Sequence, residues 1–314
     1  MWESEKMQSE ENTMKCGKKG LIEIIRGDAR DVLKRFPAGT FDLIVTSPPY
    51  ADARKGHYDG VTPNSYVDFI VSFHAEFWRV LADNGSFVLN IKDKVVDGVR
   101  HRFVWHTIES LQKLGWRSVD DYVWVKPNAM PGRWPNRLRD EWEYCFHLTK
   151  SKKFCMYQDS VRRPIGKWAE VRLKNLNGKS AQRHNSENGS GFGRDLRRWV
   201  DTQTVFPGNA LIIPLVGKNM GHPAVFPVAL PKFFISLFTK EGDAVLDPFA
   251  GSGSTGEACL ELGRRCALID TKPEYVELMR ERLSKVSQQD KSLAKNILKT
   301  GNQETNPSLF PPSM

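Results

Sequence analysis

Short apolar runs that alternate with helical segments constrain the fold of this 314-residue chain more than any other feature of its sequence. The runs are rich in β-branched residues, and most of them stop at Gly, Pro, Asp or Asn, which is typical of strands. We expect seven strands, at residues 21–25, 41–45, 86–91, 118–125, 141–148, 244–246 and 266–269. Apolar residues at helical spacing predict helices at residues 29–36, 66–81, 103–114, 228–238, 255–262 and 273–283. Strands that alternate with helices predict an α/β fold with a doubly wound, mostly parallel seven-stranded sheet.

The segment 150–210 interrupts this alternation. It is rich in Gly, Asn and Ser and has little apolar periodicity, so we interpret it as an inserted lobe or a long functional loop. Between residues 150 and 199, thirteen Lys or Arg residues stand against four acidic ones, an excess equal to the net charge of +9 of the whole chain. A local basic block favours a polyanionic partner, with nucleic acid first, although a solvated loop can have the same composition.

The ends of the chain and its cysteines limit the class of protein. Residues 1–19 and 287–314 are polar without periodicity, and we expect disordered tails there. No apolar run is long enough to span a membrane and no secretory signal opens the chain, so we expect a cytoplasmic protein. The five cysteines form no Cys-x-x-Cys pair, which argues against zinc and against a disulfide framework, and we expect no metal site.

Residues 247–256, Asp-Pro-Phe-Ala-Gly-Ser-Gly-Ser-Thr-Gly, lie between an expected strand and an expected helix. Glycines let a ligand approach the backbone, and the N-terminus of a helix attracts an anionic group. Asp270 ends the next strand, where its carboxylate can accept hydrogen bonds from ribose hydroxyls. The Gly-x-Gly-x-x-Gly spacing also fits the NAD-binding domain of an oxidoreductase. However, only residues 271–314 follow Asp270, and a carboxylate at Asp247 suits the cationic, amine-bearing end of S-adenosylmethionine better than a pyrophosphate.

A second motif, Thr46-Ser47-Pro48-Pro49-Tyr50, follows a strand expected to be buried. Two consecutive prolines end that strand and stiffen the turn. The Ser47 hydroxyl, the Pro48 carbonyl and the Tyr50 ring are then presented at the carboxyl end of a parallel strand, where ligands bind in such sheets. A proline-stiffened loop without a function is the alternative, but the aromatic residue and the glycine loop elsewhere favour a functional turn.

Ser47-Pro48-Pro49-Tyr50 resembles the catalytic motif of the DNA amino-methyltransferases, and residues 247–253 resemble their S-adenosylmethionine motif. The catalytic motif comes first, a basic region follows and the cofactor motif comes last, an order similar to that of the permuted beta class. The resemblance covers about residues 20–285. It implies a circularly permuted, Rossmann-like methyltransferase fold that uses S-adenosylmethionine. Its parts would be a catalytic part at 20–149, a target-recognition region at 150–210 and a cofactor-binding part at 211–286.

The resemblance also implies roles for single residues. The Ser47 side chain and the Pro48 carbonyl would accept hydrogen bonds from the target amine, and Tyr50 would stack on a base flipped out of the duplex. Asp28 would bind the adenine amine of the cofactor. The cofactor-binding residues that it implies are Asp28, Thr46, His222, Pro223, Asp247, Pro248, Phe249, Ala250, Gly251, Gly253, Ser254 and Asp270. After His222-Pro223 this chain reads Ala-Val-Phe-Pro, a departure from the Lys-Pro that the family usually has there.

Residues 124–128 and 137–141 resemble the segment beside the target base, although Trp124 and Trp142 fit core packing equally well. A loop after the catalytic turn and the basic region would contact DNA. The candidate DNA-binding residues are Arg54, Lys55, Arg133, Arg137, Arg162, Arg163, Lys167, Arg172, Arg194, Arg197 and Arg198.

The chemistry that these motifs predict is methylation of an exocyclic base amine in double-stranded DNA. The chain has no Pro-Cys pair, which argues against methylation of cytosine carbon 5, where a cysteine nucleophile is needed. In the family, Ser-Pro-Pro-Tyr is associated mainly with cytosine N4, and adenine N6 is the alternative. A DNA-binding protein without activity is a hypothesis from another class. We expect a monomer or homodimer, with a restriction endonuclease as a further partner.

Overall fold

The computed structural model of the chain describes residues 11–16, 20–51, 61–129, 131–167, 171, 182–183, 194–195, 203–215 and 227–289. The chain forms two compact units, one of residues 1–157 with 209–314 and the other of residues 158–208. Among the residues described, no helix is long and apolar enough to cross a membrane.

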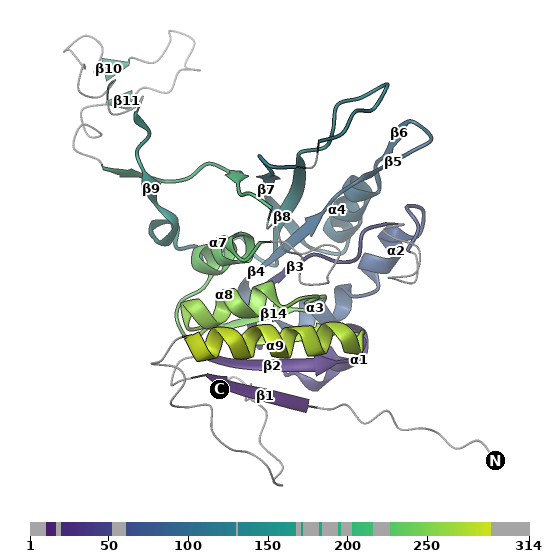
Figure 1. Ribbon diagram of the computed structural model, residues 1–314, viewed down its shortest axis with the longest axis vertical. Helices are drawn as coiled ribbons and strands as arrows, with labels where there is room; N and C mark the ends of the chain where they lie inside the picture. Colours follow the sequence, from purple (N-terminus) through teal and green to yellow (C-terminus); the bar gives the residue numbers. More distant parts are fainter. Residues whose placement is uncertain are drawn as a thin grey trace. The chain divides into compact units, whose positions relative to one another are not determined.

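The larger unit is built on a nine-stranded sheet with the order β1-β2-β15-β14-β3-β4-β8-β7-β13 (Figure 1). Neighbouring strands from β2 to β4 are parallel, whereas β8 runs antiparallel to both β4 and β7. The strands span β1 Glu11–Cys16, β2 Gly20–Arg26, β3 Phe41–Thr46, β4 Leu81–Ile91, β7 Arg117–Val125, β8 Trp142–Thr149, β13 Ala210–Ile212, β14 Ala244–Asp247 and β15 Arg265–Asp270. The short strands β5 Lys94–Val96 and β6 Val99–His101 form a separate hairpin.

All seven expected strands are present as consecutive members of this sheet, which confirms the α/β fold, and the structure adds one strand at each edge. A disordered tail was expected at 1–19, and this is wrong for residues 11–16, which form β1 and pair antiparallel with β2. An edge strand bonds through its backbone, so a polar segment without periodicity can form one. At the other edge, β13 has three residues, too few for a periodic pattern.

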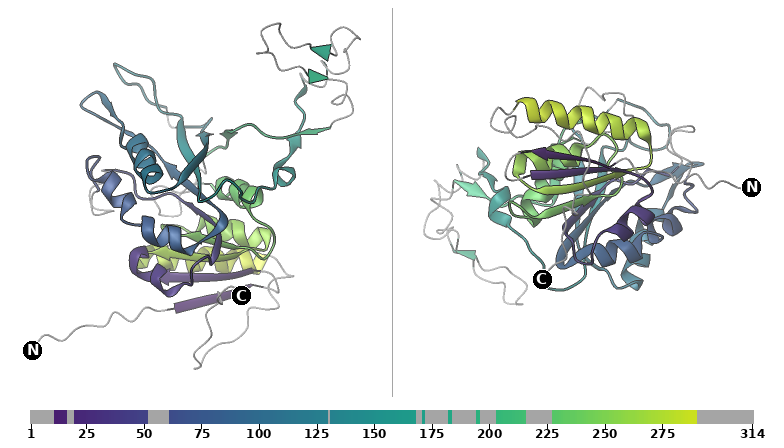
Figure 2. Two further views of the ribbon diagram at one scale, coloured as in Figure 1. Left: turned by 180° about the vertical axis from the view of Figure 1, so that it is seen from behind. Right: turned by 90° about the horizontal axis from the view of Figure 1, so that it is seen from below.

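Helices cover both faces of the sheet (Figure 2). One face carries α7 Ala229–Phe238, α8 Ser254–Leu262 and α9 Pro273–Gln289, and the other carries α1 Ala29–Val32, η1 Leu33–Arg35, α2 Tyr66–Val71, α3 His74–Val80 and α4 Phe103–Lys113. The single helix expected at 66–81 is two helices in the structure, α2 and α3, and β4 follows α3 directly. α9 runs past its expected end into the expected tail, and the Glu281–Lys285 ion pair (2.6 Å) supports the turn just beyond that expected end.

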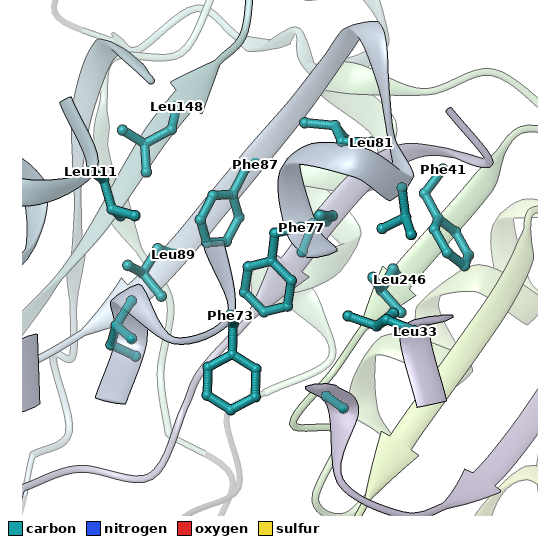
Figure 3. Close-up of a cluster of buried hydrophobic side chains, with 14 of the residues drawn as sticks. Leu33, Phe41, Phe73, Phe77, Leu81, Phe87, Leu89, Leu111, Leu148 and Leu246 are labelled. Atoms are coloured by element: carbon teal, nitrogen blue, oxygen red, sulfur yellow. The ribbon is translucent and has the colours of Figure 1, made fainter. Parts of the chain in front are cut away.

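Aromatic side chains fill the core between the sheet and the helices α1 to α4 that cover one of its faces (Figure 3). Phe41 of β3 and Phe87 of β4 are fully buried. Phe77 of α3 packs edge-on against Phe87, with ring centroids 5.5 Å apart. This packing holds the parallel strands in place, and the carboxyl ends of these strands carry both sequence motifs.

The smaller unit contains η2 Gln158–Val161 and the two-residue strands β9 Arg163–Pro164, β10 Gln182–Arg183, β11 Arg194–Asp195 and β12 Thr204–Val205. β9 pairs with β12 and β10 with β11, both antiparallel. The expected boundaries at 150 and 210 enclosed too much of the chain. The Cys155 N–H donates to the Asn84 carbonyl (3.0 Å) and the Tyr157 N–H donates to the Leu237 carbonyl (2.6 Å), so residues up to 157 belong to the larger unit.

Candidate active site

The two sequence motifs meet at the carboxylate of Asp247. β14 pairs with β3 in parallel, so two segments 201 residues apart end side by side. Thr46 Oγ1 donates to Asp247 Oδ1 at 2.6 Å, and Thr255 Oγ1 donates to Asp247 Oδ2 at 2.5 Å. The backbone N–H of Phe249 also donates to Oδ1, at 3.2 Å. This fully buried carboxylate therefore ties the catalytic strand to the glycine loop.

The surroundings of Asp247 give it a role that the sequence did not indicate. Burial raises its pKa to about 6, and the hydrogen bonds from Thr255 and Thr46 act in the opposite direction. Both carboxylate oxygens are already used within the protein. Asp247 braces the site, and its contact with the cationic end of a cofactor stays a prediction.

The loop between β14 and α8 is shaped to let a ligand approach its backbone. Gly251 and Gly253 have φ values of 51° and 81°, in the left-handed region that favours glycine. A Cβ atom at Gly253 would lie 2.9 Å from Met279 Cγ, so the turn excludes a side chain there. Asp270 holds the loop from the next strand, because its Oδ2 accepts from the Gly251 N–H at 2.9 Å and its Oδ1 from the Lys272 N–H at 3.0 Å.

These polar groups fit a nucleoside cofactor. A carboxylate stands at the strand end where ribose hydroxyls can bind, beside a glycine turn and a helix N-terminus. Burial raises the pKa of Asp270, and its two backbone N–H donors oppose that shift. Pro248 and Ala250 lie buried in the same loop, and Ser254 is buried at the first position of α8. The Phe249 ring packs against Phe73 with centroids 5.0 Å apart, so it anchors the loop on the α2–α3 side.

Asp28 follows β2, which lies next to β15 in the sheet. Its side chain caps α1 by accepting from the Arg30 N–H at 2.8 Å. Both carboxylate oxygens also accept from the Arg30 guanidinium, which lowers the pKa of Asp28. The predicted contact with an adenine amine would therefore share a carboxylate that Arg30 already binds.

At the catalytic turn, Pro48 is buried while Ser47, Pro49 and Tyr50 are half-buried. The Tyr50 hydroxyl donates to Glu143 Oε2 at 2.6 Å and lies 3.4 Å from Asn90 Oδ1. Ser47 Oγ lies 3.5 Å from the Tyr50 hydroxyl oxygen. Burial, reinforced by the Glu143 carboxylate, raises the pKa of Tyr50 well above its usual range, so this side chain is a neutral phenol.

A buried ion pair stands behind this turn. Lys126, just after β7, donates through Nζ to Glu143 Oε1 on β8, and the two residues are 9% and 4% exposed. The Lys126 ammonium also lies over the Trp124 ring, 4.3 Å from its centroid. Burial lowers the pKa of Lys126, and the adjacent carboxylate opposes that shift. β7 runs parallel to β3 and β4, so this pair joins the carboxyl edge at which the motifs lie.

The sequence alone predicts no role for Glu143 and Asn90, and Lys126 enters only as part of the segment that resembles the one beside the target base. A signal was present: Glu143 is a charged residue in the mostly apolar strand β8, and Asn90 follows a buried apolar run at the end of β4. A buried charge needs a partner, but the sequence does not show which strand supplies it.

The segment beside the catalytic edge contains core and exposed residues. Trp124 is buried and its Nε1 donates to the Ile213 carbonyl at 2.8 Å, which is the role of a core residue. Trp142 is partly exposed and packs against Tyr144. Arg133 is exposed, whereas Arg137 lies over the Trp134 ring (4.5 Å) and pairs with Asp140 (3.3 Å).

In the smaller unit, Arg163 and Lys167 are exposed. Arg162 is engaged within the unit, since it donates to Thr204 Oγ1 at 2.9 Å and lies 4.4 Å from the Phe206 ring centroid. Arg194 is in β11. The remaining predicted site residues lie outside the described residues: Arg54, Lys55, Arg172, Arg197, Arg198, His222 and Pro223.

The Rossmann-like sheet places the Ser-Pro-Pro-Tyr turn and the glycine loop at one edge, the arrangement expected of a methyltransferase that acts on exocyclic amines. Comparison with known proteins agrees: the family model of N6 and N4 methyltransferases, described as DNA methylase, matches residues 41–281. The chain belongs to this family of DNA methylases, which confirms the resemblance seen in the motifs.

Relatives span nearly the whole chain. The type II methyltransferase M.Cfr9I of Citrobacter freundii is 32% identical over 296 residues, covering 83% of this chain and 87% of the relative. M.SmaI of Serratia marcescens is 29% identical over 297 residues, covering 83% and 90%. Among solved structures, the PvuII cytosine-N4-specific DNA methyltransferase superposes with a TM-score of 0.62 at 25% identity, covering 87% of this chain and 95% of its own. A protein from Thermus thermophilus, solved as a complex with S-adenosyl-L-methionine, superposes with a TM-score of 0.55 at 25% identity, covering 83% and 92%.

Proposed function

We propose that this DNA methylase transfers a methyl group from S-adenosylmethionine to the N4 amine of a cytosine flipped out of duplex DNA. The observation that carries the proposal is the Asp247 carboxylate, which fixes the Ser47-Pro48-Pro49-Tyr50 turn to the glycine loop through Thr46 and Thr255. The PvuII enzyme, whose fold this chain shares, is cytosine-N4-specific, and this supports the choice of base.

The chain's own residues would activate and align the amine. The amine nitrogen is a poor nucleophile because its lone pair is delocalised into the base. Hydrogen bonds from its two N–H groups to Ser47 Oγ and to the Pro48 carbonyl draw it towards tetrahedral geometry, and the double proline keeps that carbonyl fixed. The Tyr50 ring offsets part of the few kcal/mol that flipping a base costs. After transfer the amine loses one proton to solvent.

Asp270 and the loop from Asp247 to Ser254 would hold the cofactor, with Asp28 near its adenine. When bound, S-adenosylmethionine supplies a methyl group on a sulfonium sulfur. Because Gly251 and Gly253 have no side chains, the turn that Asp270 holds would let the cofactor approach the loop backbone closely.

We assign target recognition to the unit of residues 158–208, with Arg163 and Lys167 as exposed phosphate or base contacts. Because the relatives are type II methyltransferases, the protein would modify DNA in the cytoplasm as the partner of a restriction endonuclease or alone. It would act as a monomer or homodimer.

The test is to incubate the full-length protein with plasmid DNA and labelled S-adenosylmethionine, digest the DNA to nucleosides and identify the labelled one by mass spectrometry. We expect N4-methylcytosine. Labelled N6-methyladenine would transfer the proposal to the adenine alternative. Cofactor binding without any labelling of DNA would instead support a binding protein that has lost its activity.

A further inference from the structure

Ser47 can accept a hydrogen bond from a base amine only through a lone pair of Oγ, because the amine presents N–H donors. A hydroxyl has one proton and two lone pairs, and its proton rotates towards whichever acceptor is near. A proton that pointed at the base would compete with the amine protons. A serine in this role therefore needs an acceptor for its own proton on the side away from the base.

The structure supplies this acceptor in the Tyr50 hydroxyl oxygen, 3.5 Å from Ser47 Oγ. The distance is long, and catalytic hydrogen bonds in ligand-free proteins commonly shorten when the substrate binds. Tyr50 in turn donates to Glu143 Oε2 at 2.6 Å, a short, charge-assisted bond. With its proton committed to Glu143, the Tyr50 oxygen has only lone pairs to offer Ser47.

Glu143 sets this direction because an ionised carboxylate accepts and does not donate. Lys126 binds its other oxygen, and both residues are almost fully buried. A buried carboxylate needs a charged or hydrogen-bonding partner, and the Lys126 ammonium is that partner for Glu143. The raised pKa of Tyr50 is consistent with this direction, since the phenol retains the proton that it donates.

Asn90 reinforces the same direction from β4. Its Nδ2 donates to the Tyr144 carbonyl at 2.9 Å, which leaves Oδ1 facing the Tyr50 hydroxyl at 3.4 Å. The two strand residues that face this hydroxyl, Glu143 and Asn90, are thus both acceptors.

We propose that Tyr50, Glu143 and Lys126 form a directed hydrogen-bond relay that turns the Ser47 proton away from the base and so makes Ser47 Oγ an acceptor for the target amine. The inference rests on the proposed function, and it assigns Glu143 and Lys126 as positioning residues. Aligned bonds polarise one another, so the relay also strengthens a neutral hydroxyl as an acceptor.

The test is a double-mutant cycle on single-turnover methylation by the full chain. Tyr50→Phe keeps the ring and removes the hydroxyl, and Glu143→Gln replaces the carboxylate by an amide. We expect each change to slow methyl transfer about 10- to 100-fold, with cofactor and DNA dissociation constants changed less than ~3-fold, since only the transition-state contact of Ser47 is lost. In a Ser47→Ala background, neither change should slow transfer by more than ~3-fold.

Glu76→Gln is the matched control, because Glu76 is a half-buried carboxylate paired with Arg79 at 2.6 Å on α3, away from the carboxyl edge. It should leave the rate unchanged. The relay would be overturned if Tyr50→Phe or Glu143→Gln slowed methyl transfer by the same factor in the Ser47→Ala background as in the wild type. It would also be overturned if these changes lowered only DNA affinity. Either result would leave the proposed function intact.

The same cycle can be read without activity, from the denaturant midpoint of unfolding. Ser47→Ala should shift the midpoint less in Glu143→Gln than in the wild type, because Tyr50 lies between Ser47 and Glu143 and is within hydrogen-bond distance of both. Equal shifts would overturn the relay even if the wild type methylates a different base or no base at all.

Discussion

The two units of the chain use their polar side chains in opposite ways. In the larger unit, polar groups are buried at one edge of the sheet and bond between elements: Asp247 joins β3 to the start of α8, and Glu143 joins β8 to the catalytic turn. In the smaller unit the described strands are two residues long, and Arg163 and Lys167 point into solvent. Chemistry that depends on the direction of single hydrogen bonds is built into a packed frame, whereas contact with a long polyanion needs only accessible charge.

The largest effect on methylation is expected at Ser47, in the packed frame of the larger unit. Ser47→Ala should lower the single-turnover rate about 10²- to 10³-fold, because one acceptor of the target amine is lost. Cofactor affinity, measured by calorimetry, should stay within about twofold. A similar loss of cofactor affinity would mean that Ser47 shapes the cofactor loop and does not act on the base.

Asp247 tests the buried frame through pH. An unfolded aspartate has a pKa near 4, and in the folded protein the pKa of Asp247 is about 6. The stability linked to this group is therefore fully present below pH ~4 and is lost as pH rises through ~6, a change of about 3 kcal/mol. Chemical unfolding across this range should show that loss in the wild type and not in Asp247→Asn. A constant difference between the two proteins would contradict the buried, protein-bound carboxylate.

The glycine loop offers a steric test with an internal control. Gly253→Ala combines a left-handed φ with a contact of 2.9 Å to Met279 Cγ, whereas Gly39 has a φ of 69° and no atom within 4 Å of an added Cβ. We expect Gly253→Ala to cost about 2 kcal/mol more unfolding free energy than Gly39→Ala. Equal losses of unfolding free energy in the two variants would show that the loop can shift to make room for a side chain at residue 253.

The smallest effect is expected in the smaller unit. Alanine at Arg163 or at Lys167 should lower the slope of log affinity against log salt by about 1 and weaken DNA binding several-fold, if each neutralises one phosphate. Lys232→Ala is the control, since Lys232 is a partly exposed lysine of the larger unit paired with Glu261 at 2.5 Å. An unchanged slope in both Arg163→Ala and Lys167→Ala would move recognition to another part of the chain.

The same contrast explains how much the sequence could predict. Apolar periodicity located the seven central strands, and motif resemblance located Ser47 and Asp247, because both signals are local. The partners of these residues are not local. Glu143 reaches Tyr50 only because β8 lies between β4 and β7, and Thr46 reaches Asp247 only because β14 lies beside β3. Strand neighbours depend on the packing of the whole sheet, which periodicity along one chain does not encode.

Edges and boundaries were missed for a related reason. β1 and β13 pair with the sheet through backbone hydrogen bonds, and the Cys155 and Tyr157 N–H groups are among the contacts that hold residues 150–157. Backbone hydrogen bonds leave little mark on side-chain composition. The basic composition of 150–210 therefore located the smaller unit but not its ends.

The central claim is that the Ser47 turn directs a methyl group to the N4 nitrogen of cytosine. The most direct measurement uses S-adenosylmethionine with a ¹³C-labelled methyl group and duplex DNA with ¹⁵N at cytosine N4, followed by digestion and NMR of the nucleosides. We predict a one-bond ¹³C–¹⁵N coupling in the methylated cytosine, absent from DNA treated with Ser47→Ala for the same time. A ¹³C methyl group on adenine, or on carbon 5 of cytosine, would contradict the account.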